Sequence, residues 1–202
     1  LAVLLGNPPK EFRATSTTIT QLVDTAGKLS QNRRGALIVV DLGSDLRPED
    51  FLYSGTNIEA QLSTDLLINL FATDTPLHDG AVLVKGNKII SAGVILPLSR
   101  QGISRYGTRH LAALGITERF DRCICIVVSE ETGTLSLANQ GKLERPITSS
   151  RLQELLAKLI GNQNSMGANK ASLNKNVSSQ KTDSSDNIIS DINKKESEKS
   201  EI

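Results

Sequence analysis

GALIVVDL, residues 35–42, is an almost uninterrupted apolar run that is rich in β-branched side chains. A strand with one face in water alternates apolar and polar residues, whereas a strand covered on both faces is apolar at successive positions. We therefore predict that this run forms a central strand of a sheet, with further layers of the protein packed on both of its faces.

Helical periodicity surrounds this run. In TITQLVDTAGKLSQ, residues 18–31, the apolar positions follow the period of a helix, and threonines at the start can cap it. STDLLINLF, residues 63–71, predicts a short helix that is capped by Ser63. Another helix is expected to begin near Thr108 and to lose its apolar pattern around Gly115.

A last helix is expected after a cap at Thr148 or Ser149, because leucines then form one apolar stripe before Gly161. The other apolar segments have the composition of strands, and turn residues separate them. These segments are AVLV and IISAGVIL (81–84 and 89–96, joined as a hairpin), RCICIVVS (122–129) and TLSLAN (134–139). Hairpins among helices predict an α/β fold in which helices cover both sides of a mixed sheet.

The two ends of the chain differ from this folded part, which we place at residues 12–161. Residues 162–202 are dominated by serine, asparagine and mutually cancelling charges, so we expect a disordered polar tail. Residues 1–11 open with LAVLLG and have no initiator methionine. We expect this opening to be the remnant of a longer apolar segment upstream.

Composition excludes some functions. The 23 lysines and arginines nearly balance the 22 acids, which argues against a nucleic-acid-binding protein but leaves room for a local cationic pocket. No stretch approaches the roughly 20 apolar residues of a membrane helix, so we expect the chain itself to be soluble. Cys123 and Cys125 fit neither zinc nor redox spacing and are expected to be inert buried thiols in a reducing compartment.

Three polar clusters fall at predicted strand ends or helix starts: HDGA (78–81), GTRH (107–110) and SEE (129–131). Taken singly, each has an ordinary structural explanation. Asp79 and Gly80 suit a turn, Thr108 suits a helix cap, and Glu130 with Glu131 suits a solvated loop.

Taken together, the clusters suit a nucleotide with a metal ion. A helix start and the fork of Arg109 suit phosphate oxygens. Asp79 and Glu131 suit a divalent cation that bridges phosphate oxygens. Neither a Walker A sequence nor GxGxxG is present, so the site is neither a P-loop nor a Rossmann site. Two minor alternatives stay open: a hydrolase triad, which lacks the G-x-S-x-G elbow, and a zinc site from His78, His110 and an acid, which lacks paired ligand spacing.

Four segments resemble the diadenylate cyclase domain over about residues 15–160, most closely its membrane-anchored bacterial type: GALIVV, LHDGAVLVKGNKIISAGVILPLS, YGTRHLAALGITE and IVVSEETGTLSLANQGKL. The resemblance implies a twisted mixed β-sheet flanked by helices on both sides. It also implies that two ATP molecules are condensed into cyclic di-AMP and two pyrophosphates. An inactive adenine-nucleotide sensor is the alternative that we keep, and an interaction module working through the tail would leave the three clusters unexplained.

The resemblance also implies roles for particular residues. The catalytic residues would be Asp79, Gly80, Arg109 and His110. The substrate-binding residues would be Ala81, Leu96 (whose backbone recognises adenine), Gly107, Thr108, Ser129 and Glu131. Asp79 and Glu131 would hold Mn²⁺ or Mg²⁺. Asp79 would also help to activate the ribose 3′-hydroxyl, and Gly80 would let the nucleotide approach closely, while His78 either orients Asp79 or merely packs.

One position departs from the family pattern. The family often has a second arginine after the histidine, but Leu111 stands there, which leaves more of the phosphate binding to Arg109. The partners implied are ATP and a second copy of the chain, in a face-to-face homodimer. Upstream transmembrane helices, absent from this chain, would hold the full-length protein at the cytoplasmic face of the cell membrane.

Overall fold

The computed structural model describes residues 10–101 and 106–161. The expected tail at 162–202, and all but the last two residues of the expected upstream remnant, lie outside the described residues. Among the described residues, no helix combines the length and the apolar character needed to cross a lipid bilayer.

The described residues form one mixed, seven-stranded sheet with the strand order β2-β4-β3-β1-β5-β6-β7. The strands β1 and β3 are parallel, and every other neighbouring pair is antiparallel. The bounds are β1 (Ala36–Asp41), β2 (Thr56–Gln61), β3 (Ala81–Lys85), β4 (Lys88–Val94), β5 (Cys123–Val128), β6 (Leu135–Asn139) and β7 (Lys142–Ile147).

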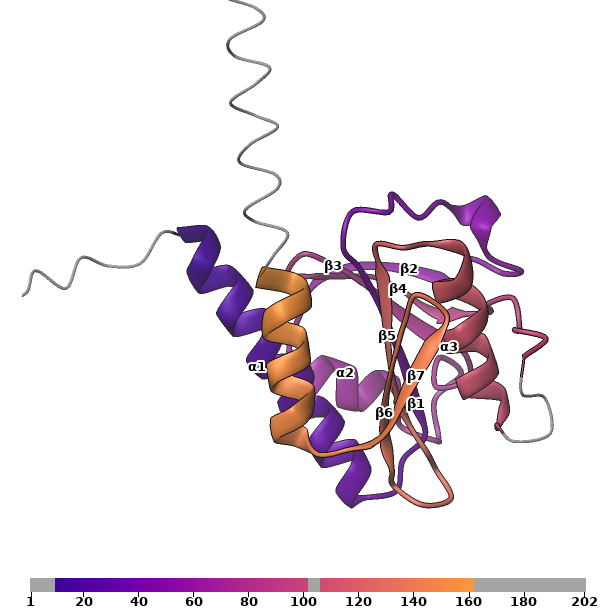
Figure 1. Ribbon diagram of the computed structural model, residues 1–202. Helices are drawn as coiled ribbons and strands as arrows, with labels where there is room; N and C mark the ends of the chain where they lie inside the picture. The colour runs from indigo at the N-terminus through magenta and orange to yellow at the C-terminus, as the bar shows by residue number, and fades with distance from the viewer. Residues whose placement is uncertain (1–9, 102–105, 162–202) are drawn as a thin grey trace, which may run out of the picture. The chain divides into compact units, whose positions relative to one another are not determined.

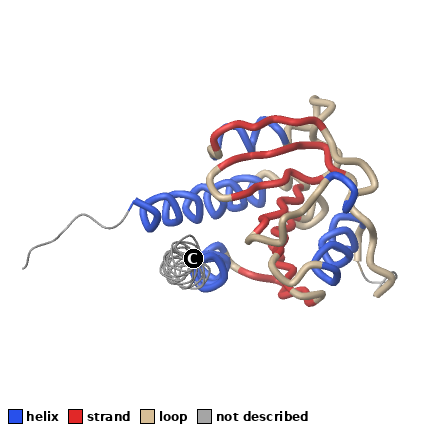
Figure 2. Tube along the Cα trace, turned by 90° about the horizontal axis from the view of Figure 1, so that it is seen from above, coloured by secondary structure: helices blue, strands red, loops and turns tan. Residues whose placement is uncertain are grey.

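Helices cover both faces of this sheet (Figures 1 and 2). On one face lie α1 (Lys10–Gln31), α2 (Thr64–Leu70) and an unlabelled helix of residues 149–161, drawn in orange in Figure 1. On the other face lies α3 (Thr108–Arg119). The sequence prediction of an α/β fold with helices on both sides is therefore confirmed.

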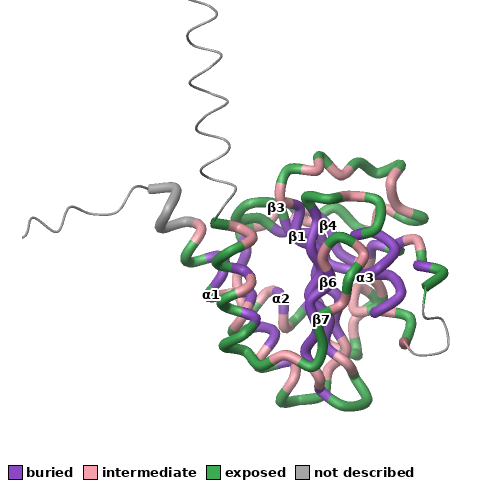
Figure 3. The backbone as a smooth tube through the Cα atoms, in the orientation of Figure 1, coloured by how far each residue is buried: buried purple, intermediate pink, exposed green. Residues whose placement is uncertain are grey.

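Burial of β1 explains why both layers form. All six of its residues are buried, and Figure 3 shows the central strands as the most buried part of the backbone. Ile38 and Val40 point into the core beneath α1 and α2, whereas Leu37 and Val39 point into the core beneath α3. The prediction of a central strand covered on both faces is thus correct.

The edge strands β2 and β7 were not predicted. Their sequences, TNIEAQ and KLERPI, are polar and mostly exposed, because an edge strand pairs on one side only and has little apolar surface to cover. The cap predicted at Ser63 is confirmed, since its Oγ accepts a hydrogen bond from the amide of Leu66 at 3.2 Å. Of the two caps proposed for the last helix, Thr148 is the one that accepts a hydrogen bond, from the amide of Arg151 at 3.1 Å.

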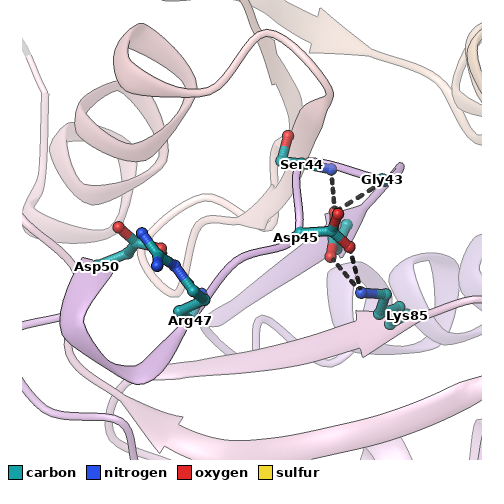
Figure 4. Close-up of polar contacts among 7 residues, drawn as sticks. Gly43, Ser44, Asp45, Arg47, Asp50 and Lys85 are labelled. Carbon is teal, nitrogen blue, oxygen red and sulfur yellow. Dashed lines mark hydrogen bonds and ion pairs between the residues drawn. The ribbon is translucent and has the colours of Figure 1, made fainter.

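An ion cluster fills the carboxyl end of the parallel pair β1 and β3 (Figure 4). The carboxylate of Asp41, which is buried, accepts hydrogen bonds from the amides of Gly43 at 2.8 Å and Ser44 at 2.7 Å. Lys85 Nζ lies 3.4 Å from Asp41 and 3.0 Å from Asp45, and its hydrogen bond to Asp45 is the main reason that the pKa of Lys85 is raised. These contacts fix the loop after β1.

The helix α3 continues as a buried helix beyond Gly115, where its apolar pattern was predicted to stop. The helix continues to Arg119, and the chain segment 97–99 crosses it at Gly115. A Cβ atom added there would collide with the carbonyl oxygen of Pro97 and would lie 2.7 Å from the amide nitrogen of Ser99. Glycine is needed at this position for close packing, not for stopping the helix.

We expect Gly115→Ala to lower the free energy of unfolding by about 1–3 kcal/mol, because overpacking against backbone outweighs the better helix propensity of alanine. Gly27→Ala in α1 is the matched control, since a Cβ there would lie an ordinary 3.5 Å from Ser149 Oγ. The control should be neutral or stabilising by up to about 1 kcal/mol. Urea denaturation measures both, and equal stability of the two variants would contradict this packing argument.

Candidate functional site

Two adjoining hollows lie at the edge of the sheet where β1 and β3 begin. Strand register brings the other lining segments to this edge, because Ala36 pairs with Val128 and Ala81 pairs with Val94. The polar hollow is lined by residues 107–110, residues 128–132 and Arg145. The apolar hollow is lined by Leu37, Asp79, Gly80, residues 94–96, Leu98, Thr108, Arg109, Ala112 and Glu130.

The hollows share three residues, Thr108, Arg109 and Glu130. Arg109 Nη1 donates to Glu130 Oε2 at 2.7 Å, and the two side chains are 25% and 62% exposed. This pair joins the start of α3 to the loop between β5 and β6. It lies where the two hollows meet.

Gly35, at the entrance to β1, leaves room for this pair. A Cβ atom at Gly35 would lie 2.5 Å from Arg109 Nη1 and 2.7 Å from Glu130 Oε2. From the sequence, Glu130 was expected in the third polar cluster or in a solvated loop, and Gly35 only as the first residue of the apolar run; neither was expected to take part in this contact. A pair 21 residues apart leaves no periodic signal, so sequence reasoning had no means of finding it.

The start of α3 faces the polar hollow without a capping side chain. The cap residue is Gly107, so the alternative of Thr108 as cap is wrong, and Thr108 is the first residue of the helix. A helix start carries the positive end of the helix dipole and amide groups that suit anions. Ser129 and Glu131 line the same hollow from the opposite loop.

His110 is buried at the base of the polar hollow. Its Nε2 lies 3.3 Å from Ser136 Oγ, and its ring stacks on Tyr106 with 6.2 Å between the ring centroids. Burial, and secondly the positive charge of Arg145, lower the pKa of His110 below its ordinary value. His110 therefore favours the neutral form, which suits packing and hydrogen bonding better than ionic attraction to phosphate.

Asp79 is exposed in the turn before β3, and Gly80 follows it with a φ of +110°. A Cβ atom at Gly80 would lie 2.8 Å from the carbonyl carbon of Gly93 and 2.9 Å from Val94 O. The positive φ agrees with the turn that the sequence predicted as the structural explanation of Asp79 and Gly80. The close approach of Gly80 to the backbone of β4 was not predicted. Nδ1 of His78 lies 2.5 Å from Thr75 O. Among the described residues, the side chain of His78 is therefore hydrogen-bonded within its own loop.

The structure brings most of the predicted site residues to these two hollows. The polar hollow holds Gly107, Thr108, Arg109, His110, Ser129 and Glu131, and the apolar hollow holds Asp79, Gly80 and Leu96 along with Thr108 and Arg109. Ala81 is buried and lines neither hollow, and the same is true of Leu111. Arg145 lines the polar hollow although the sequence analysis had not selected it.

The donor set for a metal is divided between the hollows. Asp79 lines the apolar hollow, whereas Glu131 lines the polar hollow, and both side chains are exposed. Within residues 10–101 and 106–161, no group of three His, Cys, Asp or Glu side chains lies close enough together to hold a metal ion. The zinc alternative, built on His78 and His110, has no such cluster among these residues. Carboxylate oxygens at Asp79 and Glu131 are chemically suited to Mn²⁺ or Mg²⁺.

The two cysteines line neither hollow. Cys123 and Cys125 are free and fully buried on the α3 side of the sheet. Burial, and then the neighbouring thiol of Cys123, raise the pKa of Cys125 well above its ordinary value, so this thiol stays protonated. The prediction of buried thiols is confirmed.

Comparison with known proteins identifies the family. The model for DAC, DisA bacterial checkpoint controller nucleotide-binding, matches residues 23–143. A diadenylate cyclase of Listeria monocytogenes is 47% identical over 132 residues, which are 64% of this chain and 47% of the relative. The cyclic di-AMP synthase CdaA of Bacillus subtilis is 40% identical over 153 residues, covering 75% of this chain and 54% of the relative. The chain thus spans about half the length of these curated relatives.

A solved structure agrees with this result. The crystal structure of a double mutant of DacA from Staphylococcus aureus superposes with a TM-score of 0.65 at 37% sequence identity, over 71% of this chain and 95% of that one. The fold and the resemblance inferred from the motifs are both confirmed, and the chain belongs to the DAC family of nucleotide-binding domains.

Proposed function

We propose that this domain is a diadenylate cyclase that condenses two ATP molecules into cyclic di-AMP and two pyrophosphates. The observation that carries the proposal is the meeting of an apolar and a polar hollow at Arg109, in a domain whose relatives are named diadenylate cyclase or cyclic di-AMP synthase. A nucleotide is likewise divided into an apolar part and a polar part, because it has a flat base at one end and a charged phosphate chain at the other.

The hollows suggest how ATP binds. Adenine would enter the apolar hollow against Val94 and Leu96, while the phosphates would extend past Arg109 toward the start of α3. Arg109 lines both hollows, so its guanidinium would meet the α-phosphate. To do so it must exchange its bond with Glu130 for bonds to phosphate oxygens, which it can bind in a bidentate manner.

The chemistry forms one P–O bond and breaks another at each α-phosphorus. The ribose 3′-oxygen of one nucleotide attacks the α-phosphorus of the other, pyrophosphate leaves, and the proton of the 3′-hydroxyl is released. Asp79, exposed at the rim of the apolar hollow, would accept this proton or direct its departure. Asp79 and Glu131 would hold Mn²⁺ or Mg²⁺, which when bound stabilises charge on the phosphate oxygens.

A face-to-face homodimer would supply the second nucleotide. Cyclic di-AMP has two-fold symmetry, so two sites related by a two-fold axis can close both of its bonds. Large apolar side chains surround the rim of the apolar hollow, where Ile95 and Leu98 are exposed. Leu52 and Tyr53, which are 71% and 58% exposed, are hydrogen-bonded to Ile95 through the backbone. A second copy facing the hollow would cover these side chains.

A nucleotide sensor without turnover is the second candidate. The division of Asp79 and Glu131 between two hollows favours it, because a cyclase needs carboxylates that act on the same phosphates.

The resemblance to the membrane-anchored type supports a site of action at the cytoplasmic face of the cell membrane in the full-length protein. Fractionation of cells that express the full-length protein would test that location.

Asp79→Asn should reduce the formation of cyclic di-AMP by at least about 100-fold, because it removes the charge needed at the 3′-oxygen and keeps the side-chain shape. ATP binding and thermal stability should change little. Mass spectrometry of the product after incubation with ATP and Mn²⁺ or Mg²⁺ gives the rate. Asp74→Asn, an exposed residue of the same loop that lines neither hollow, is the control and should retain full activity. Near-normal turnover of Asp79→Asn would remove Asp79 from the mechanism.

Specific activity should fall as the protein is diluted over about a thousand-fold range at saturating ATP and metal, because the dimer dissociates. Leu52→Ser should move this fall to higher protein concentration, since Leu52 lies at the exposed rim and lines neither hollow. Activity per mole of protein and sedimentation are measured on the same samples. Constant specific activity of a protein that remains monomeric would refute the facing-site mechanism.

A further inference from the structure

Arg145 extends into the polar hollow from the edge strand β7. The Cζ atom of its guanidinium lies 5.6 Å from the centroid of the Tyr106 ring, which holds the charge by a cation–π contact. None of the ion pairs between described residues includes Arg145. Its neighbour Glu144 is paired with Arg151, at 2.8 Å, and does not neutralise it.

The two arginines of the polar hollow therefore differ in their electrostatic state. Arg109 is paired with Glu130, whereas Arg145 lines the hollow and contacts the aromatic ring of Tyr106. Arg145 and His110 both contact the ring of Tyr106, so they lie near each other. After burial, the positive charge of Arg145 is the second cause of the lowered pKa of His110. Arg145 is thus an exposed cation at the polar hollow that an anion can approach.

The two arginines also differ in position. Arg109 lines both hollows, but Arg145 lines only the polar one. Strand pairing shows how β7 reaches this edge, since Ile147 pairs with Leu135 and Leu135 pairs with Val128, the last residue before the lining loop. A phosphate chain that starts at Arg109 and enters the polar hollow would approach Arg145 with its far end.

We propose that Arg145 binds the terminal phosphates of ATP and stabilises the pyrophosphate that leaves. This assignment rests on the proposed function and adds a substrate-binding residue to it. When the bond between the α-phosphorus and its bridging oxygen breaks, the electron pair stays on pyrophosphate, and the guanidinium of Arg145 stabilises that charge. The contact distinguishes ATP from AMP and from cyclic di-AMP, which carry no terminal phosphates.

The test compares Arg145→Gln with Lys142→Gln, which removes an exposed cation from the same strand outside the hollow. Calorimetry measures the binding of three probes: 3′-deoxy-ATP (which lacks the attacking hydroxyl), AMP and cyclic di-AMP. Arg145→Gln should weaken 3′-deoxy-ATP binding by about tenfold or more, the usual effect of losing a hydrogen bond to a charged group. Binding of AMP and cyclic di-AMP should stay within about twofold, and Arg145→Lys should recover part of the loss. Lys142→Gln should bind all three probes like the unmodified protein.

A second measurement shows that the variant is folded and that the charge is gone. NMR titration should find the pKa of His110 higher in Arg145→Gln, because a positive charge that opposed protonation has been removed. When this shift in pKa is observed, two results would overturn the role of Arg145 in phosphate binding. One is that the unmodified protein and Arg145→Gln bind 3′-deoxy-ATP with equal affinity. The other is that Arg145→Gln loses affinity equally for all three probes. If the unmodified protein still makes cyclic di-AMP when one of these two results is found, the proposed function stands and only the role of Arg145 is refuted. If the unmodified protein makes no cyclic di-AMP, but Arg145→Gln selectively weakens the binding of 3′-deoxy-ATP, the result would refute the cyclase activity. The contact between Arg145 and the terminal phosphates would then stand.

Discussion

Burial of β1 on both faces is the constraint on which the domain depends. A strand whose residues from Ala36 to Val40 are all apolar needs a layer on each side, and α1, α2 and α3 provide these layers. The carboxyl end of β1 is closed by Asp41 and Lys85. Its amino end begins after Gly35, where the missing side chain leaves space for the ion pair between Arg109 and Glu130. The same strand thus fixes the core and the place where the two hollows meet.

The charge balance of the polar hollow follows from this arrangement. Two arginines and two glutamates line it, so the hollow is not uniformly cationic. Glu130 holds Arg109 in position, at the entrance to β1, and a phosphate must replace that carboxylate as its partner. Arg145 contacts an aromatic ring and pairs with no carboxylate among the described residues, so it needs no such exchange. In this account ATP is first attracted through its terminal phosphates, and the α-phosphate is bound when Arg109 changes partner.

Sequence periodicity predicted the parts of the molecule that are buried on regular faces. The central strand, the hairpin of β3 and β4, and the capped helix after Ser63 all carry local signals of apolar spacing or capping. The strands β2 and β7 were missed because edge strands pair on one side and expose most of their side chains. The apolar pattern of α3 was expected to stop around Gly115, but glycine is needed there because a distant chain segment packs against it, which leaves no local signal.

In the candidate site, too, some features have local sequence signals and others depend on the packing of distant segments. The motif residues Asp79, Arg109 and Ser129 line the two hollows, and each lies at the end of an element that the sequence predicted. Arg145 comes from an edge strand that was not predicted, and Glu130 acquires its role only through contact with α3. Such contacts depend on how distant elements are packed, which local patterns do not record.

The most direct test of this account is a crystal structure of the domain with 3′-deoxy-ATP and Mn²⁺. We predict adenine against Leu96 in the apolar hollow, the α-phosphate on Arg109 with its bond to Glu130 broken, and the terminal phosphates toward Arg145. A nucleotide with its base in the polar hollow, or one bound while the pair of Arg109 and Glu130 stays intact, would contradict the account.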